Sequence, residues 1–353
     1  MVIEIVQALL RFDCRIHIGT ATMPTVLYKK LLQLLGEKNN VYEVKLPDVT
    51  LNSFNRHQVD KLKSFDDIYP ILDNLENNPE KVLIVVNTVK KAQNIFKEIE
   101  EKYPEIPKML MHSRFRRSDR VALEKKLKEE FNGDSKGEYP EGTSPCIVVS
   151  TQVVEVSLDI SFDRMITDCA PLDSLIQRFG RINRVRSDET IGKYKPVHVI
   201  EPQGNVLPYK MDILKASFEQ LPDNFSLLEE NTLQQKIDSV YPELKLMEID
   251  LHLIFRDGKY NIKELTNNNR SVLIEALDIE SATCILSEDR EDYINCSWED
   301  RINLEIPINY KSIMWHRSKY EQLEIGANPF VIPQDMEEYI QFGLQLVEHK
   351  NIV

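Results

Sequence analysis

The sequence predicts an α/β protein with a doubly wound parallel sheet, followed by a mixed α+β C-terminal region. Three short apolar runs carry this prediction, since each is bounded by polar residues and followed by a helical pattern or a loop: 82–86, 109–111 and 147–150. Two further runs, 165–168 and 197–200, complete five strands. Strands that alternate with helices in this way form right-handed βαβ units, and these build a parallel sheet with helices on both faces.

The first 80 residues favour helices and only short strands. The apolar period predicts a helix over 2–10, and a strand that ends in Gly19–Pro24 follows it. Thr25 is a suitable N-cap for a helix over Val26–Leu35, which Gly36 ends. Two short extended segments and a further helix come next, at 41–46, 54–59 and 65–77.

From Lys81 onward, helices alternate with the five strands. Thr88 can cap the helix after the first strand, and Ser118 opens another that extends to Phe131. Glycines and a proline make 132–144 a surface loop. After about residue 205 the alternation stops. The remaining patterns are two helices, a mixed segment, two short strands and a terminal helix, at 211–221, 227–240, 246–255, 283–286, 302–306 and 336–347.

The composition is that of an ordinary folded protein, and 353 residues leave room for two domains. No apolar run reaches the length of a membrane span, and the first residues lack a signal-peptide pattern. The five cysteines include no C-x-x-C pair, and Cys14, Cys146 and Cys169 lie in apolar runs where buried, reduced thiols are expected. These features favour a cytoplasmic protein without a membrane anchor or a structural zinc.

Positive charge is concentrated in two stretches, 111–120 and 177–186, although the chain carries a net charge of −13. The local field matters more for a binding cleft than the total charge does. In the second stretch Gln177, Arg181 and Arg184 stand at i, i+4 and i+7, so a helix would place them on one face. Guanidinium groups on one face can neutralise and clamp phosphate oxygens.

Polar residues directly follow the first three strands. His112, Ser113 and Arg114 follow the second, where they can grip a nucleic-acid phosphate without reading bases. Thr88 and Thr151 hold the corresponding position after the first and third strands, and each can also cap a helix. Parallel sheets bind ligands at the carboxyl ends of their strands, so we expect all of these groups, and the arginine stretch, at that edge.

Asp159 follows the third strand and either accepts hydrogen bonds from a ribose hydroxyl or orders an arginine across a cleft. Neither a G-x-x-x-x-G-K-[ST] loop nor a D-E-x-[DH] run occurs, so the usual means to cradle β- and γ-phosphates and to hold their Mg²⁺ are missing. His-Asp dipeptides of the metal-nuclease kind are also missing. The seven histidines are scattered, and none is assigned as a metal ligand.

Five segments resemble, in order and spacing, the motifs of superfamily 2 helicases. They are Gly19–Pro24 (motif III), Val82–Thr88 (motif IV), His112–Arg120 (a phosphate-binding element), Ser150–Asp159 (motif V) and Gln177–Arg184 (motif VI). The wording S-T-Q-V-V-E-V-S-L-D, Q-R-F-G-R-I-N-R and M-H-S-R-F is similar to the CRISPR-associated helicases of type I interference systems. The resemblance covers 12–200 and is weaker over 201–353.

The resemblance implies an ATP-driven motor of RecA-like fold that moves along single-stranded DNA, feeds an HD-type nuclease and is recruited to an RNA-guided surveillance complex. By position, Arg181 and Arg184 would be arginine fingers, and Gln177 would help arrange the triphosphate. Asp159 and Ser157 would lie at the nucleotide side of the same cleft. The other implied roles are DNA-backbone binding and coupling, for Thr88, His112, Ser113, Arg114, Thr151 and Gln152, and for Thr20, Ala21 and Thr22.

The resemblance also implies four segments: the end of the first motor domain, the second RecA-like domain, a mostly helical connection and a C-terminal domain, at 1–24, 25–205, 206–270 and 271–353. The phosphate-binding loop, the DExH carboxylates and the HD nuclease would lie upstream of Met1, in the half that holds ATP and Mg²⁺. We therefore expect the chain alone to be inactive, with Arg181 and Arg184 exposed and largely unpaired. Two alternatives remain open: a stand-alone nucleic-acid-binding or assembly module without ATPase activity, and a superfamily 2 helicase that acts on RNA.

Overall fold

The computed structural model of the chain describes residues 2–20, 22–36, 41–131, 145–155, 159–184, 187–188, 190–243, 255–256, 259–260, 281–314 and 316–346. Contacts divide the chain into two compact units. The first comprises Met1–Met111 and Glu124–Leu244, and the second comprises His112–Leu123 and Lys245–Val353. The segment His112–Leu123 therefore belongs to the second unit, although it lies within the first in sequence.

A seven-stranded sheet, in the order β3-β4-β2-β5-β6-β1-β7, forms the centre of the first unit. Its strands are β1 (His57–Leu62), β2 (Lys81–Val85), β3 (Lys108–Met111), β4 (Cys146–Ser150), β5 (Arg164–Asp168), β6 (Lys195–Ile200) and β7 (Ser226–Leu227). Strands β1 to β6 pair in parallel, and β7 runs antiparallel to β1. The predicted doubly wound parallel sheet is confirmed.

Strands β2 and β4 lie inside the sheet because their side chains are apolar on both faces. Every position of β2 and β4 is buried. A strand covered on both sides has a continuous apolar run rather than an alternating one, which is the pattern of 82–86 and 147–150. At the periphery, β1 begins with alternating buried and half-buried positions instead.

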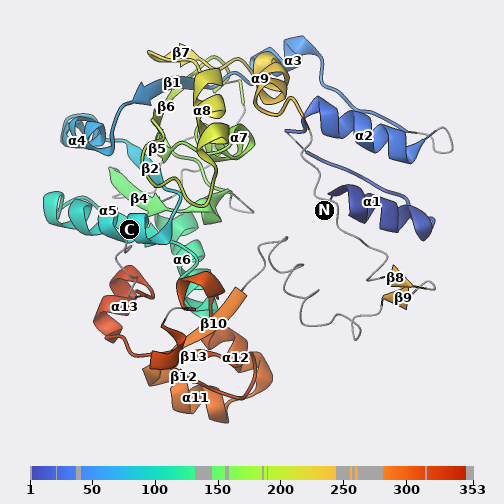
Figure 1. The fold of residues 1–353 in the computed structure, drawn as a ribbon. Helices are drawn as coiled ribbons and strands as arrows, with labels where there is room; N and C mark the ends of the chain where they lie inside the picture. The colour runs from blue at the N-terminus through green and yellow to red at the C-terminus, as the bar shows by residue number, and fades with distance from the viewer. Residues whose placement is uncertain are drawn as a thin grey trace. The chain divides into compact units, whose positions relative to one another are not determined.

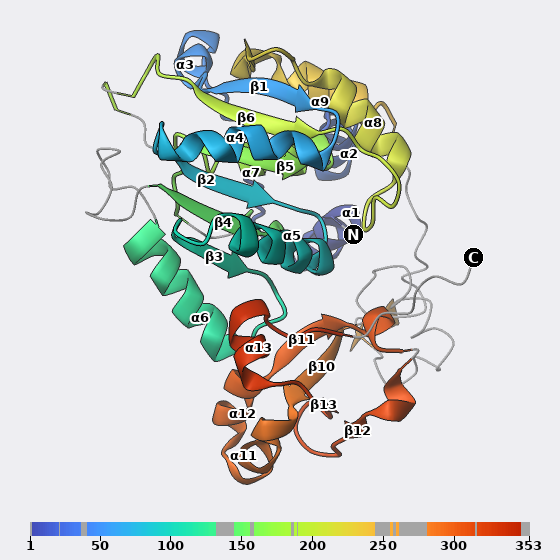
Figure 2. The same ribbon diagram turned by 90° about the vertical axis from the view of Figure 1, so that its left-hand side faces the viewer.

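Helices cover both faces of this sheet, as Figures 1 and 2 show. On one face lie α4 (Tyr69–Asp73) and α5 (Val89–Lys102), and on the other lies α7 (Leu172–Phe179), against which α8 (Met211–Gln220) and α9 (Leu233–Val240) pack. Helix α5 turns Ala92, Ile95, Phe96 and Ile99 inward at the helical period. The predicted helix over 65–77 is α4 with a 3₁₀ turn at each end.

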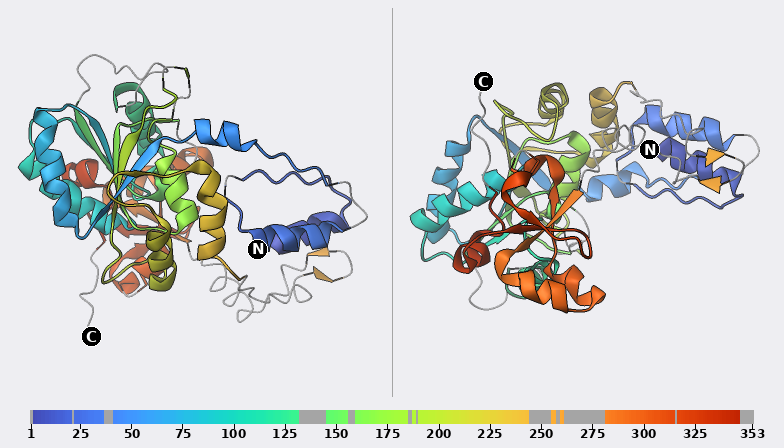
Figure 3. Two further views of the ribbon diagram at one scale, coloured as in Figure 1. Left: turned by 90° about the horizontal axis from the view of Figure 1, so that it is seen from above. Right: turned by 60° about the horizontal axis from the view of Figure 1, so that its bottom comes forward.

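Helices α1 (Val2–Arg11) and α2 (Thr25–Leu35) pack against each other around Ile3, Val6 and Leu31 (Figure 3). Thr25 is the first residue of α2 rather than its cap. Its backbone N–H and its hydroxyl donate to Asp238 of α9, at 2.6 and 2.7 Å. Two further helices belong to the chain before 131: α3 (Asp48–Ser53) and α6 (Arg117–Lys126).

The strand predicted to end in Gly19–Pro24 is not formed, and 14–20 is irregular. A strand needs a neighbour that completes its hydrogen bonds, and none accompanies this segment among the residues that the structure describes. Cys14 is therefore exposed, contrary to prediction, whereas Cys146 and Cys169 are buried as predicted. For the same reason the predicted extended segment at 41–46 is irregular.

The second unit contains a four-stranded sheet in the order β11-β10-β13-β12. Its elements are β10 (Ser281–Leu286), α11 (Arg290–Asn295), α12 (Trp298–Leu304), β11 (Ile306–Asn309), β12 (Glu321–Gln322), β13 (Phe330–Ile332) and α13 (Met336–Phe342). Phe115, from the inserted segment, is buried in its core beside Cys284, Ile306 and Tyr339. The predicted mixed α+β character of the C-terminal region is confirmed.

Two predictions for this unit are wrong in detail. The strand predicted over 302–306 is the end of α12, which Ser297 caps by accepting the N–H of Asp300, and β11 starts at Ile306. The terminal helix stops at Phe342, because Gly343 takes φ 68°.

The predicted loop over 132–144 and most of the mixed segment 246–255 lie outside the described residues, apart from the paired strands β8 (Phe255–Arg256) and β9 (Lys259–Tyr260). Along the described part of the chain, no helix combines the length and the apolar character that a membrane crossing requires.

Candidate functional site

A pocket of about 400 Å³ gathers the residues of the arginine stretch at the amino end of β1. Its lining includes Arg56, His57, Gln177, Gly180, Arg181 and Arg184. We expected this stretch at the carboxyl edge of the sheet, and that expectation is wrong. Helix α7 returns from the end of β5 antiparallel to the strands, so its last turn and the residues after it reach the opposite, amino-terminal edge.

The helical argument for this grouping is also wrong, although the grouping itself exists. Helix α7 ends at Phe179, before Arg181 and Arg184. Beyond it, Ile182 forms a parallel bridge with Phe162 beside β5, and Asn183 takes φ 51°. Asparagine tolerates this left-handed conformation better than most residues. Gln177 and the two arginines therefore line one pocket because the chain turns back there.

Arg181 is buried, with 8% of its surface exposed. Its Nε donates to the Val154 carbonyl at 2.8 Å and one terminal nitrogen donates to the Glu155 carbonyl at 2.6 Å. Burial lowers the pKa of its guanidinium, and the nearby charge of Arg184 lowers the pKa further. The expectation that Arg181 is exposed and unpaired is wrong. In this structure it fixes the turn after β4.

Arg184 forms an ion pair with Asp159, with 2.8 Å between Nε and Oδ1. The Arg184 side chain is 41% exposed and that of Asp159 is 85% exposed. Arg184 is therefore accessible, as expected, but it is paired. Of the two roles left open for Asp159, ordering an arginine is the observed contact. Ser157, the other predicted nucleotide-side residue, lies outside the described residues.

The strongest polar contacts of the arginine stretch belong to Arg178, to which the sequence assigned no role. Its side chain is fully buried, and its Nε donates to Glu155 at 2.8 Å. Its terminal nitrogens donate to Thr167 Oγ1 at 2.9 Å and to Asn87 Oδ1 at 3.0 Å. Arg178 thus joins α7 to β5 and to the residue after β2. The sequence does contain a sign of this role, because Arg178 falls on the apolar face of α7 with Leu172 and Leu175.

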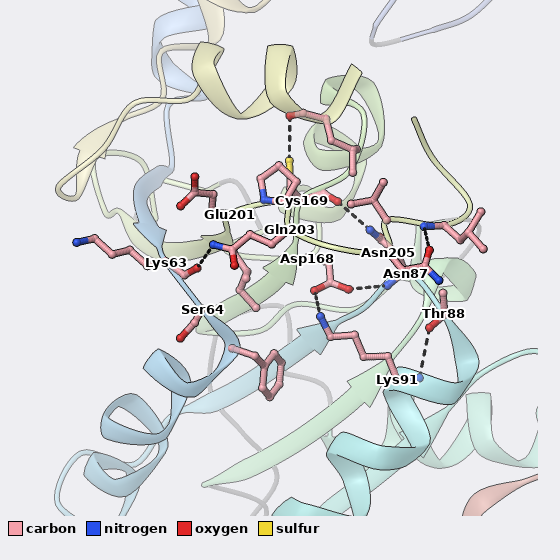
Figure 4. Close-up of a pocket in the computed structure, with 16 residues that line it drawn as sticks. Lys63, Ser64, Asn87, Thr88, Lys91, Asp168, Cys169, Glu201, Gln203 and Asn205 are labelled. Carbon is pink, nitrogen blue, oxygen red and sulfur yellow. Dashed lines mark hydrogen bonds and ion pairs between the residues drawn. The ribbon is translucent and has the colours of Figure 1, made fainter. Parts of the chain in front are cut away.

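A second pocket, of about 200 Å³, lies at the carboxyl ends of β2, β5 and β6. Figure 4 shows Asn87, Lys91 and Asp168 of its lining pointing toward one another. Lys91 Nζ lies 2.6 Å from one oxygen of Asp168, and the backbone N–H of Asn87 donates to the other at 3.0 Å. The sequence pattern did not single out these three residues. A polar residue at the end of an apolar strand, as Asn87 and Asp168 are, is the feature of the sequence that could have identified this pocket.

The predicted DNA-binding residues of the first unit differ in accessibility. Thr88 is half-buried in this second pocket, where it caps α5 by accepting the N–H of Lys91 at 3.3 Å. Gln152 donates to the Asn87 carbonyl at 2.8 Å. Thr151 is only 2% exposed, so its hydroxyl is out of reach of a phosphate in this structure, contrary to prediction.

His112 is likewise unavailable to a phosphate. It is fully buried in the second unit, where its Nδ1 accepts the N–H of Arg114 at 3.1 Å and its Nε2 donates to the Phe342 carbonyl at 3.0 Å. Burial lowers its pKa to about 3, so the imidazole is neutral. The contact of His112 with nucleic acid stays a prediction, which its buried position in this structure does not support. Its neighbours Ser113 and Arg114 are half-buried in the same unit.

The predicted coupling residues show one local contact. The N–H of Thr22 donates to Thr20 Oγ1 at 3.1 Å, which closes a short turn, and Ala21 lies outside the described residues. In the part of the chain that the structure describes, no group of three or more histidine, cysteine, aspartate or glutamate residues could hold a metal ion.

Comparison with known proteins places these features in a family context. Residues 78–187 match the family model described as CRISPR-associated nuclease/helicase Cas3, C-terminal. The CRISPR-associated nuclease/helicase Cas3 of Streptococcus thermophilus is 28% identical over 244 residues, which cover 67% of this chain and 24% of that protein. The protein of the same description from Methanothermobacter thermautotrophicus is 32% identical over 199 residues, which cover 53% and 22%. The chain spans about a quarter of the length of the curated relatives it matches.

Two solved structures are similar in fold. T. fusca Cas3 with AMPPNP gives a TM-score of 0.57 at 16% identity, over 84% of this chain and 40% of that one. A CRISPR RNA-guided surveillance complex in a pre-nicking state includes a chain with a TM-score of 0.53 at 19% identity, over 85% and 43%.

Proposed function

We propose, from the match of residues 78–187 to the Cas3 C-terminal family model, that the chain supplies the second motor domain of an ATP-driven helicase that moves along single-stranded DNA in CRISPR defence. Its relatives are described as nuclease/helicases, and one similar chain belongs to an RNA-guided surveillance complex. A complex of that kind is the proposed partner. The nucleotide-binding half and the nuclease would be provided by another domain.

The pocket at the amino end of β1 is the observation that supports this proposal most. Arg181, Arg184 and Gln177 line one pocket, and guanidinium groups fit the oxygens of a triphosphate. A family structure with AMPPNP agrees with a nucleotide ligand. When bound, ATP would supply the phosphoryl group that is transferred to water. Mg²⁺ would be held, with the nucleotide, mainly by the other motor domain.

We assign the two arginines different tasks. Arg181 holds the carbonyls of Val154 and Glu155 and so keeps the wall of the pocket in place. Arg184 is the finger, because its partner Asp159 is largely exposed and an exposed ion pair contributes only about 0–1 kcal/mol. A phosphate oxygen can therefore replace the Asp159 carboxylate at little cost. The guanidinium would then neutralise charge that develops on the γ-phosphate.

The DNA backbone would be held by groups that remain accessible: Thr88 in the first unit, and Ser113 and Arg114 in the second. Hydroxyl and guanidinium groups hold phosphates without reading bases, which suits a motor that moves along any sequence. His112 and Thr151 are left out of this proposal because both are buried in this structure.

The test measures ATP hydrolysis in the presence of single-stranded DNA. The chain alone should stay at the blank, and mixing or fusing it with the first motor domain of the Streptococcus thermophilus relative should produce turnover. In that assembly Arg184→Gln should lower the rate about 10³-fold or more. Arg15→Gln, an exposed arginine outside the pocket, is the matched control and should not change the rate. Turnover by the isolated chain that disappears in Arg184→Gln would contradict the proposed division of labour.

A further inference from the structure

The pocket at the amino end of β1 contains a third arginine, Arg56, which stands directly before β1. Its Nε is shielded from solvent and has no hydrogen-bond partner among the described residues. The Glu230 carboxylate lies 3.9 Å from that nitrogen, which is too far for a hydrogen bond. An unsatisfied buried donor costs about 1–3 kcal/mol, so its presence beside a pocket calls for a ligand that would satisfy it.

The charges around Arg56 also favour an anion. Arg181 and Arg184 line the same pocket, and two of the groups that Arg181 binds are the neutral carbonyls of Val154 and Glu155. Burial lowers the pKa of Arg56. Glu230 opposes this effect, and the charge of Arg184 adds to it. An arginine nevertheless keeps its proton, so three guanidinium groups line the pocket against two carboxylates, Glu155 and Glu230, and Glu155 is already paired with the buried Arg178.

We propose that Arg56 and Arg184 form a preformed polyphosphate-binding site beside the buried guanidinium of Arg181, and that Arg56 donates its unpartnered Nε–H to a phosphate oxygen. The arginines already lie together in the isolated chain, so binding requires little ordering of side chains. The identification of the natural ligand as a nucleoside triphosphate rests on the proposed function. The anion site itself requires only the chain described here.

Calorimetric titration of the purified chain with inorganic tripolyphosphate at low salt tests the site. We expect binding in the wild type and a Kd about tenfold higher in Arg56→Gln and in Arg184→Gln, since each removes one charge-assisted hydrogen bond. Arg56→Lys keeps the charge but loses Nε, so its Kd should be intermediate. Arg15→Gln is the matched control and should leave Kd unchanged. Thermal melting of each variant without ligand confirms that it is folded.

Glu230→Gln provides a second test that does not depend on Arg56 variants being stable. If Arg56 binds phosphate, removal of the competing Glu230 carboxylate should tighten tripolyphosphate binding about two- to threefold, which would be the coupling of two partly exposed charges. If Arg56 serves only as a structural partner of Glu230, this variant should melt at a lower temperature and bind the anion no more tightly.

The outcomes separate this inference from the proposed function. Failure of the wild type to bind tripolyphosphate, or equal affinity in Arg56→Gln, overturns the inference. If affinity falls in Arg184→Gln but not in Arg56→Gln, the role of Arg56 is wrong and the proposed function stands. If both variants lose the anion but Arg184→Gln leaves turnover of the assembled motor unchanged, the anion site stands and the proposed function is wrong.

Discussion

Arg178 and Arg181 are both buried near the pocket at the amino end of β1, and they bind different groups of the same residue. Arg178 donates to the carboxylate of Glu155, while Arg181 donates to the carbonyl of the same residue. Glu155 is thus held from two sides. Burial raises the pKa of its carboxyl group, and the charge of Arg178 opposes that shift. Among the described arginines of this stretch, Arg178 and Arg181 therefore support the turn after β4, and Arg184 is the accessible one.

The first prediction concerns this support. Arg178→Met should lower the free energy of unfolding by about 3–5 kcal/mol, because it leaves the Glu155 carboxylate buried without its partner. Urea denaturation followed by circular dichroism measures the change. Gln177→Ala, at the exposed neighbouring position of α7, is the control and should cost less than about 0.5 kcal/mol. A similar small loss for Arg178→Met would show that the buried pair is not what holds α7 to the sheet.

The second prediction concerns pH. Burial lowers the pKa of His112 to about 3 and that of His198 to about 4, below the ordinary value of 6.5. Between the folded and the unfolded pKa of each histidine, the unfolded chain binds more protons than the folded chain. The contribution of each histidine to the free energy of unfolding is therefore fully present above pH 6.5 and is lost as the pH falls toward its folded pKa. Each histidine contributes about 1.4 kcal/mol per pH unit in that window.

Urea denaturation at pH 7.5 and pH 5.0 checks this expectation. His112→Asn, whose amide oxygen can accept the N–H of Arg114 in place of Nδ1, should lose less stability between the two pH values than the wild type. His17→Asn, at an exposed position, should lose as much as the wild type. Equal acid sensitivity in all three proteins would assign the effect to carboxyl groups instead.

Among the helices, α5 is notable because Thr88, the residue before it, has two possible roles: capping the helix and binding a DNA phosphate. Its hydroxyl caps the helix, and the same residue lines the pocket at the carboxyl edge of the sheet. A helix N-terminus satisfies its free N–H groups with a side-chain oxygen and also attracts negative charge. The capping and DNA-binding roles are therefore compatible, and a substitution that keeps only one of them can separate them.

Thr88→Asp is that substitution, and it is the third prediction. Aspartate caps a helix at least as well as threonine, so the free energy of unfolding should change by less than about 0.5 kcal/mol. Its negative charge should repel a DNA phosphate and weaken the binding of a single-stranded oligonucleotide several-fold, as measured by fluorescence anisotropy. Thr88→Ala should instead cost about 1 kcal/mol of stability. If Thr88→Asp binds DNA as tightly as the wild type, Thr88 is only a cap.

At the scale of the whole molecule, the net charge of −13 should disfavour nucleic acid, and binding must depend on local positive charge. One such stretch, His112–Leu123, is built into the second unit, where Arg116 forms a two-point ion pair with Asp289 at 2.7 and 2.8 Å. Part of the positive charge in 111–120 is therefore used for structure. The guanidinium of Arg116 is therefore not available to a DNA phosphate in this structure.

The fourth prediction concerns the effect of salt on DNA binding. The Kd of the chain for single-stranded DNA should rise with salt, with a slope that corresponds to only a few phosphate contacts, and should depend little on sequence. Anisotropy titrations between about 50 and 200 mM salt measure the slope. A flat salt dependence would contradict the roles given to Ser113 and Arg114. Tighter binding to a matched RNA strand would favour the RNA-helicase alternative.

Five of the seven strands of the sheet, most of its helices and the residues of the arginine stretch could be predicted from the sequence. Continuous apolar runs such as 82–86 can be buried only between helices, and the alternation with amphipathic helices leaves a parallel sheet as the solution. Local signals also located the cap at Thr88. These predictions succeeded because they depend on interactions between residues close in sequence. The apolar period and the polarity of each segment reflect those interactions directly.

Tertiary structure alone decided which edge of the sheet carries the arginine pocket, which arginine is accessible, and that His112 is buried in another unit. Each depends on contacts between residues far apart in sequence: Arg181 with Val154, Arg184 with Asp159, and His112 with Phe342. A motif lists side chains that can bind phosphate, but burial and pairing decide which of them still can. Arg56 was missed for the same reason, because it lies outside every motif and joins the pocket only through the fold.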